Sequence, residues 1–159
     1  MNKKLAEMLS VLLADTVNYR ALAHGYHWNV KGPEFHQFHE IFGDLYADAD
    51  SAVDPLAENI RRLGFDAPFT LGDFISLSDL DTNPVTNGNA LDMTASLYQV
   101  NVQISEKLGA TFKCANDCNE QGIANFLAER IDQHTKWIWQ LGTVIGADKT
   151  SVTILNFEE

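Results

Sequence analysis

Four of the five histidines fall in one sixteen-residue window, as two His-x-x-His pairs: His24, His27, His36 and His39. A carboxylate pair, Asp54 and Glu58, follows with a spacing of four. Residues three or four apart lie on one face of a helix, so the members of each pair can turn toward a common point. Imidazole and carboxylate together suit iron, zinc or manganese, whereas calcium and magnesium favour oxygen ligands. The histidine window therefore predicts part of a transition-metal site.

The separation between the histidines and the carboxylates constrains this site. If residues 39–58 form one helix, the fifteen steps from His39 to Asp54 span about 22 Å at ~1.5 Å per residue. No ligand bond reaches so far, so one subunit cannot close the site on one helix. Positions 39, 54 and 58 nevertheless share a sector of roughly 100° around that helix. Antiparallel pairing with a twofold-related copy would bring His39 of one subunit to Asp54 and Glu58 of the other.

Length and composition indicate a single globular domain over residues 1–159. The chain is 45% hydrophobic and 21% charged, and its net charge is −11, so its average surface should repel phosphate backbones and attract cations. No segment has the length of a membrane span or the uncharged core of a signal peptide, and we expect a cytoplasmic protein. Cys114 and Cys118 are too sparse for a disulfide framework or a thiolate zinc site and are expected to be free thiols.

Apolar residues recur at three- and four-residue spacing in four long segments, which predict four helices. Lys31, Gly32 and Pro33 separate the first two, and Pro33 with Glu34 suits the first turn of the second. Gly64 should end that helix, and Asn89 can cap the third. A strand-like alternation occurs only at 151–157. The expected helices span residues 4–30, 33–63, 90–115 and 119–145.

The long connection between the second and third helices, residues 65–89, is rich in Gly, Pro, Asp and Asn and predicts one short helix at 71–77. Two helical pairs joined by such a crossover are typical of the ferritin-like four-helix bundle, so the expected fold class is all-α. Di-iron proteins with this plan take ligands from Glu-x-x-His motifs inside one bundle. No Glu-x-x-His occurs in this sequence. The sequence therefore argues against an iron centre within one subunit and against a di-iron oxidase of organic substrates.

A long motif joins the histidine window to the carboxylate pair. It reads HGYHWNVKGPEFHQFHE from His24 to Glu40 and continues as DPLAENIRRLG from Asp54 to Gly64. This motif resembles the signature of the Dps family, the miniferritins, and residues 130–139 are similar to the family's last helix. The resemblance implies a hollow shell of twelve subunits. Such a shell binds iron(II), oxidises it between twofold-related subunits with a preference for hydrogen peroxide, and stores the iron(III) mineral inside.

The same resemblance assigns roles to individual residues. The iron ligands would be His27 and His39 from one subunit with Asp54 and Glu58 from its partner. Trp28 matches a tryptophan that lies beside the site in the family and intercepts oxidising equivalents. The alternative is that Trp28 is an aromatic residue of the core. His24 and His36 match no ligand and are expected to support the site or lie at the surface, and His134 is expected to be a packing residue. Those expected to line the cavity as nucleation sites are Glu40 and Asp44, and those at an acidic threefold pore are Glu120, Asn125 and Glu129.

Three positions depart from the family pattern. Gly43 stands where the family often has a carboxylate, which weakens a second metal position, and Asp44 is one step out of register. Pro55 removes a backbone donor, frees the carbonyl of Ser51 and predicts either a kinked helix or re-aimed carboxylates. Asn125 replaces an expected aspartate of the pore and reduces its field.

Together these features predict an iron-storing ferroxidase that uses peroxide, or more slowly oxygen, with zinc able to substitute at the site. The alternative is a non-catalytic shell or a DNA-compacting protein with a weakened metal site. Family members that bind DNA use basic, flexible tails. This chain begins with only Lys3 and Lys4 as basic residues and ends in two glutamates, so DNA binding is not expected.

Overall fold

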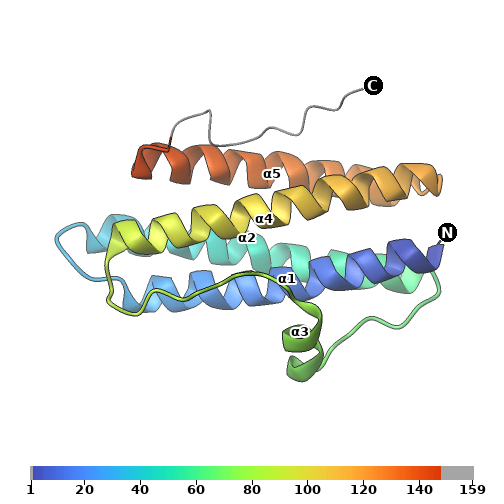
Figure 1. The fold of residues 1–159 in the computed structure, drawn as a ribbon, viewed down its shortest axis with the longest axis horizontal. Helices are drawn as coiled ribbons and strands as arrows, with labels where there is room; N and C mark the ends of the chain where they lie inside the picture. Colours follow the sequence, from blue (N-terminus) through green and yellow to red (C-terminus); the bar gives the residue numbers. More distant parts are fainter. Residues whose placement is uncertain (1, 148–159) are drawn as a thin grey trace.

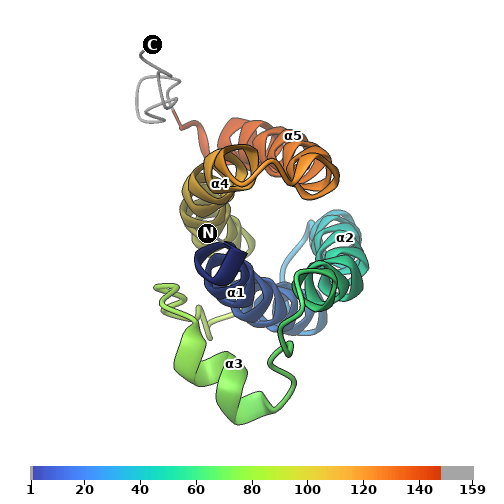
Figure 2. The same cartoon turned by 90° about the vertical axis from the view of Figure 1, so that its right-hand side faces the viewer.

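The computed structural model describes residues 2–147, and the strand-like segment expected at 151–157 lies outside them. Four long helices form the bundle: α1 and α2 pack as one pair and α4 and α5 as the other, while the short α3 lies outside the bundle against α1 (Figures 1 and 2). The predicted all-α bundle with a short helix in its crossover is confirmed. The helix bounds are α1 Asn2–Asn29, α2 Phe35–Arg62, α3 Leu71–Leu77, α4 Ala90–Asp117 and α5 Gln121–Ile145.

The turns at the helix ends follow the sequence with one correction. Gly64 has φ +90° just after α2, and the Asn89 side chain accepts a hydrogen bond from the backbone N–H of Asp92 at the start of α4, as predicted. Pro33, however, does not lie in the first turn of α2. Gly32 adopts φ +118° and accepts a hydrogen bond from the N–H of Phe35, so Pro33 belongs to the turn that precedes the helix.

Pro55 lies inside α2, and the helix continues through it from Phe35 to Arg62. The carboxylates of Asp54 and Glu58 therefore belong to the same continuous helix as His39.

No helix in the described range of the chain is long and apolar enough to cross a membrane.

A buried stripe from each long helix fills the centre of the bundle. Its largest fully buried apolar side chains include Leu5, Leu9, Leu12, Leu13, Phe42, Leu45, Ile60, Met93, Leu97, Ile104 and Ile123. Packing of these stripes supplies the main driving force for the fold, since single helices of this length are marginal in water.

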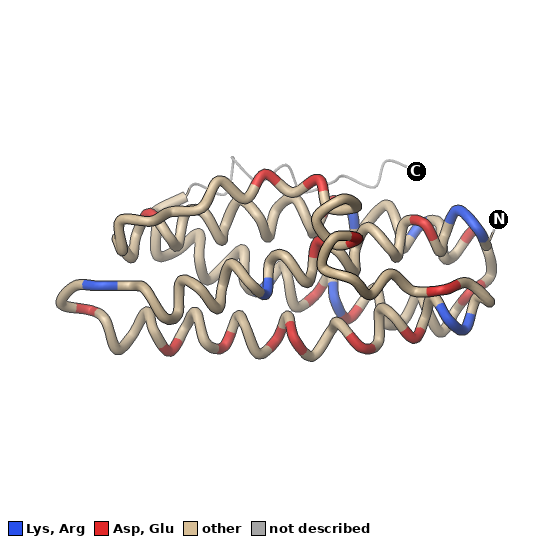
Figure 3. The backbone as a smooth tube through the Cα atoms, turned by 90° about the horizontal axis from the view of Figure 1, so that it is seen from below, with Lys and Arg blue, Asp and Glu red and all other residues tan. Residues whose placement is uncertain are grey.

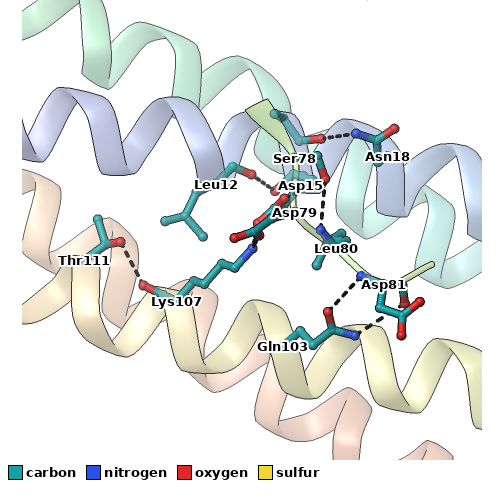
Figure 4. A network of polar contacts seen from close by, with 12 residues as sticks. Leu12, Asp15, Asn18, Ser78, Asp79, Leu80, Asp81, Gln103, Lys107 and Thr111 are labelled. Atoms are coloured by element: carbon teal, nitrogen blue, oxygen red, sulfur yellow. Dashed lines mark hydrogen bonds and ion pairs between the residues drawn. The ribbon is translucent and has the colours of Figure 1, made fainter. Parts of the chain in front are cut away.

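An ion pair fastens the crossover to the bundle (Figure 4). Asp15 on α1 is fully buried, and its carboxylate accepts hydrogen bonds from Lys107 Nζ at 2.6 Å and from the hydroxyl of Ser78 at 2.8 Å. Lys107, on α4, also pairs with Asp79. Partial burial alone would lower the pKa of Lys107, but the bonds to both aspartates outweigh it and raise the pKa. The crossover thus completes the pairing of a carboxylate that has no access to water.

Replacement of Lys107 by Met should leave the Asp15 carboxylate buried without a cation, which costs roughly 3 kcal/mol in comparable cases. We expect a lower urea midpoint for Lys107→Met and no comparable loss for Lys113→Met, an exposed position on the same helix. The double variant Asp15→Leu/Lys107→Met should recover part of the loss because no charge is then left unpaired. Equal midpoints for Lys107→Met and Lys113→Met would contradict this role of the ion pair.

Candidate metal site

His27 and His39 lie face to face where the turn between α1 and α2 folds the two helices against each other. Their ring centroids are 3.7 Å apart with an interplanar angle of 17°. Nδ1 of His27 lies 2.6 Å from the backbone oxygen of His39, and Nδ1 of His39 lies 2.7 Å from the backbone oxygen of His27. The structure therefore brings together the two histidines that the sequence predicted as ligands, at the end of α1 and in the second turn of α2.

These reciprocal hydrogen bonds determine the chemistry of both rings. A carbonyl oxygen only accepts, so each Nδ1 must carry a proton and donate it. In the neutral ring Nε2 then holds the free lone pair, and neither Nε2 takes part in a hydrogen bond within residues 2–147. Histidines that bind metal ions are commonly held in this way, by donation of the other ring N–H to a carbonyl. Both imidazoles are therefore prepared to bind a metal ion through Nε2.

The predicted carboxylates lie elsewhere on α2. Asp54 and Glu58 are exposed and make no ion pair within the described chain. Because α2 is continuous, they stay about 22 Å or more along its axis from His39 at ~1.5 Å per residue. Within residues 2–147, no three His, Cys, Asp or Glu side chains gather closely enough to hold a metal ion. One chain therefore carries two imidazoles at one position and two carboxylates at another.

Gly43 lies directly against the His27 ring. A Cβ at this position would sit 3.0 Å from Nδ1 and 3.1 Å from Cε1 of His27. Such contacts are too short for an unmoved ring, so the absence of a side chain at position 43 allows His27 to reach the carbonyl of His39. Gly43, the departure from the family pattern that was expected to weaken a second metal position, thus also has a packing reason. Asp44, the neighbouring carboxylate, is exposed, as is Glu40.

A second set of stacked rings adjoins the two histidines. His24 stacks on Tyr46 with centroids 3.8 Å apart at 20°, and its ring lies 4.0 Å from that of Trp28. The His24 centroid is 6.0 Å from that of His27. Trp28 is 63% exposed, which excludes the expectation of a core aromatic in this chain. His36 is exposed, and its ring lies edge-on to that of Phe35.

Tyr46 was missed by the sequence reasoning, although a signal for it existed. In an antiparallel pair of helices in which His27 faces His39, the residue that faces His24 must lie about one or two helical turns after His39. Tyr46 is the aromatic residue in that interval that is not part of the fully buried stripe. The signal requires the register of the hairpin, which the periodicity alone does not supply.

The centre of the bundle holds a polar network in place of a metal centre. Asp48 on α2 accepts two hydrogen bonds from Arg130 on α5, at 3.0 and 2.9 Å, and a third from Trp137 Nε1 at 3.0 Å. Burial alone would raise the pKa of Asp48, but the hydrogen bonds and charge of Arg130 outweigh it and hold the pKa below its usual value. The one carboxylate of this network is therefore committed to an ion pair. Among the described residues, this carboxylate is therefore bonded to Arg130 and Trp137 and is not available as a metal ligand.

His134 links this ion pair to the other helices. Its Nδ1 lies 2.8 Å from Oδ1 of Asn101, and its Nε2 lies 3.3 Å from an Arg130 nitrogen. Since arginine only donates, Nε2 must accept and Nδ1 must donate, so the ring is neutral. Burial, reinforced by the nearby charge of Arg130, lowers its pKa to about 3. Asn101 donates to Tyr19 Oη at 2.8 Å, and burial raises the pKa of that phenol above its ordinary range. The expected packing role of His134 is confirmed.

The residues expected at a pore follow one another along the first turns of α5. Glu120 is half-buried at the start of the helix, where its carboxylate accepts a hydrogen bond from the Asn2 amide at 3.4 Å, and Asn125 and Glu129 are exposed. In one chain they form no closed ring. Cys114 and Cys118 are free thiols, as predicted.

Comparison with known proteins agrees with the fold. A family model described as Ferritin-like domain matches residues 6–150. The DNA protection during starvation protein of Brevibacillus brevis is 29% identical over 146 residues, which cover 89% of this chain and 97% of that protein. The crystal structure of a Dps protein from Bacillus brevis has a TM-score of 0.84 at 26% identity and covers 91% of this chain and 96% of that one. The Dps protein from Vibrio cholerae O1, described as a member of a broad superfamily of ferritin-like diiron-carboxylate proteins, has a TM-score of 0.86 at 22% identity, with 91% and 90% covered.

The bundle and the domain match define a ferritin-like protein. The named relatives narrow this class, and the chain belongs to the Dps family of ferritin-like proteins. Membership of this family supports an iron-related function in general terms.

Substitution of Gly43 by Ala should push the His27 ring away from the carbonyl that orients it. Loss of such an orienting partner lowers metal affinity by about tenfold or more in other proteins. We expect weaker binding of cobalt(II), followed by its visible absorption, in Gly43→Ala. Gly25→Ala is the matched control, because no atom lies within 4 Å of a Cβ at that nearby position of α1. Unchanged cobalt affinity in Gly43→Ala would show that the ring tolerates the side chain.

The neutral, buried His134 predicts a dependence of stability on pH. Its folded-state pKa of about 3 lies below the ordinary 6.5, so acid protonates the unfolded chain first. The stabilisation is complete above about pH 6.5 and is lost as the pH falls toward 3, by at most about 1.4 kcal/mol per pH unit from this group. Urea unfolding between about pH 7 and about pH 5 should show a shallower slope in His134→Gln, whose amide can also donate and accept. Parallel slopes would refute the assignment.

Proposed function

We propose that this protein is a ferroxidase that also stores iron. Iron(II) would be bound and oxidised by hydrogen peroxide, or more slowly by oxygen, at sites shared between twofold-related subunits. The iron(III) oxide would then be kept in a hollow shell, which in this family is expected to hold twelve subunits. The observation that carries the proposal is the pair His27 and His39, whose Nδ1 protons are donated to backbone carbonyls, while neither Nε2 atom has a hydrogen-bond partner among residues 2–147.

A second chain would complete the ligand set. Asp54 and Glu58 are exposed on the helix that carries His39 and lack partners within the described chain. If two copies of α2 pack antiparallel about a twofold axis, the imidazoles of one subunit face the carboxylates of its partner at two equivalent places. Two nitrogens and two carboxylate groups match the preference of iron(II), and zinc would fit the same donors as a substitute.

The charge of the chain suits a cationic substrate. Acidic residues outnumber basic ones by 22 to 11. Figure 3 shows acidic positions along the whole bundle, while several basic positions gather toward the end that carries the N-terminus. A negative field raises the local concentration of cations. Within this proposal, Glu120, Asn125 and Glu129 would form an entry pore, and Glu40 and Asp44 would begin mineral growth.

The ligands would support the oxidation of iron(II), and the shell would store the iron(III) product. Peroxide accepts two electrons and iron(II) gives one, so two iron(II) ions together with two protons from solvent reduce each peroxide to two waters. Pairing the electrons at a protein site avoids release of the hydroxyl radical, which links the activity to protection from oxidative stress. The imidazoles and carboxylates tune the metal ion, and the cavity separates the product.

A complementation experiment tests both the activity and the shared site. Iron(II) is mixed anaerobically with the protein, then with peroxide in a stopped-flow instrument, for wild type, His39→Ala and Asp54→Ala. We expect fast oxidation in wild type and loss of the fast phase in each variant. In assemblies made by co-expressing the two variants, a site that takes histidine from one chain and carboxylate from another is intact in about one case in four under random mixing.

The outcomes separate the alternatives. A fast phase restored to about a quarter supports the shared site. Inactive single variants with no restoration in mixed assemblies of confirmed composition would place each site within one chain. Absence of a fast phase in wild type would favour the alternative, a non-catalytic or DNA-compacting shell. A salt-sensitive gel shift with DNA would then be the expected observation, because phosphate binding weakens as salt rises.

A further inference from the structure

The packing of Gly43 against His27 bears on where the second electron for peroxide comes from. A side chain is absent at the position where a second carboxylate could hold another iron ion, and the His27 ring occupies the space above it. A site that holds one iron(II) supplies one electron, whereas peroxide takes up two. A nearby group that gives one electron would complete the reaction without a second bound iron ion.

The stack of Trp28, His24 and Tyr46 lies where such a donor is needed. Tyr46 and His24 stack nearly parallel at 3.8 Å, and His24 is 4.0 Å from Trp28 and 6.0 Å from His27. The His27 ring in turn stacks on His39 at 3.7 Å. The aromatic rings are thus in close succession from the metal ligands to Tyr46. Tryptophan and tyrosine are side chains that can lose one electron, and Tyr46 is half-buried, which reduces its direct contact with solutes.

We propose that Tyr46, stacked on His24 beside Trp28, is a one-electron donor to the peroxide reaction at His27 and His39; this rests on the proposed function. Peroxide takes one electron from iron(II) and one from the phenol of Tyr46. Its O–O bond breaks, and both oxygens leave as water with the phenol proton and one proton from solvent. The products are iron(III) and a tyrosyl radical. The next iron(II) gives an electron to the radical, which takes a proton from solvent and returns to tyrosine.

Flash photolysis tests the electron path without iron. A soluble ruthenium photo-oxidant reaches Trp28, and Trp139, which is 62% exposed, is first replaced by Phe so that it does not compete. In Trp139→Phe we expect the tryptophanyl radical to decay as a tyrosyl radical appears, because Tyr46 returns an electron and a proton to Trp28. The tyrosyl signal should be lost on adding Tyr46→Phe and strongly reduced on adding His24→Leu. His24→Phe, which keeps a ring in the stack, should retain it.

Controls and a second measurement make the result decisive. Tyr98→Phe, a buried position on α4, should leave the tyrosyl signal unchanged. A signal that persists undiminished in Tyr46→Phe would overturn the proposal. With iron(II) and peroxide, freeze-quenched samples should show the same radical by electron paramagnetic resonance. Fast iron oxidation with no radical that depends on Tyr46 would overturn the donor role while the ferroxidase activity stands. Transfer in photolysis without iron oxidation would support the electron path and refute the activity.

Discussion

The rigid rise of helix α2 is the constraint on which the site depends. Fifteen helical steps separate His39 from Asp54, and the helix continues through Pro55. At ~1.5 Å per residue this distance cannot be shortened inside one chain. The same rigidity has a useful consequence, since two antiparallel copies of one continuous helix would align both halves of the site at once. A structural element that forbids an internal centre therefore favours a shared one.

The interior of the bundle is consistent with that arrangement. Ferritin-like proteins with an internal centre fill it with carboxylates and histidines that face a metal ion. Here the corresponding space contains Asp48, Arg130 and His134, which satisfy one another through hydrogen bonds, with Asn101 and Tyr19 completing the network. No buried side-chain N or O atom in the described chain lacks a hydrogen-bond partner. A satisfied network of this kind specifies how four helices pack, but it offers no ligand to a metal ion.

The environment of His27 combines orientation, packing and access to aromatic rings. Its Nδ1 is held by the carbonyl of His39, its ring is held against Gly43, and the stack of His24 with Tyr46 lies beside it. All these contacts come from the antiparallel register of α1 and α2, which are joined by the turn at Gly32. This register thus determines the protonated nitrogen of two imidazoles and the neighbours of both rings.

The sequence by itself determined the four long helices, the short helix at 71–77, the end of α2 at Gly64 and the candidate ligands, because apolar periodicity, turn residues and ligand spacing are local properties of the chain. It also determined that His39 and Asp54 cannot meet in one subunit, because helical rise is fixed by backbone geometry. Only the tertiary structure decided which nitrogen of His27 and His39 is free, why position 43 has no side chain, that Trp28 is exposed, and that Tyr46 stacks on His24. These properties depend on the register between helices. Register is set by many packing contacts acting together, and no local pattern records it.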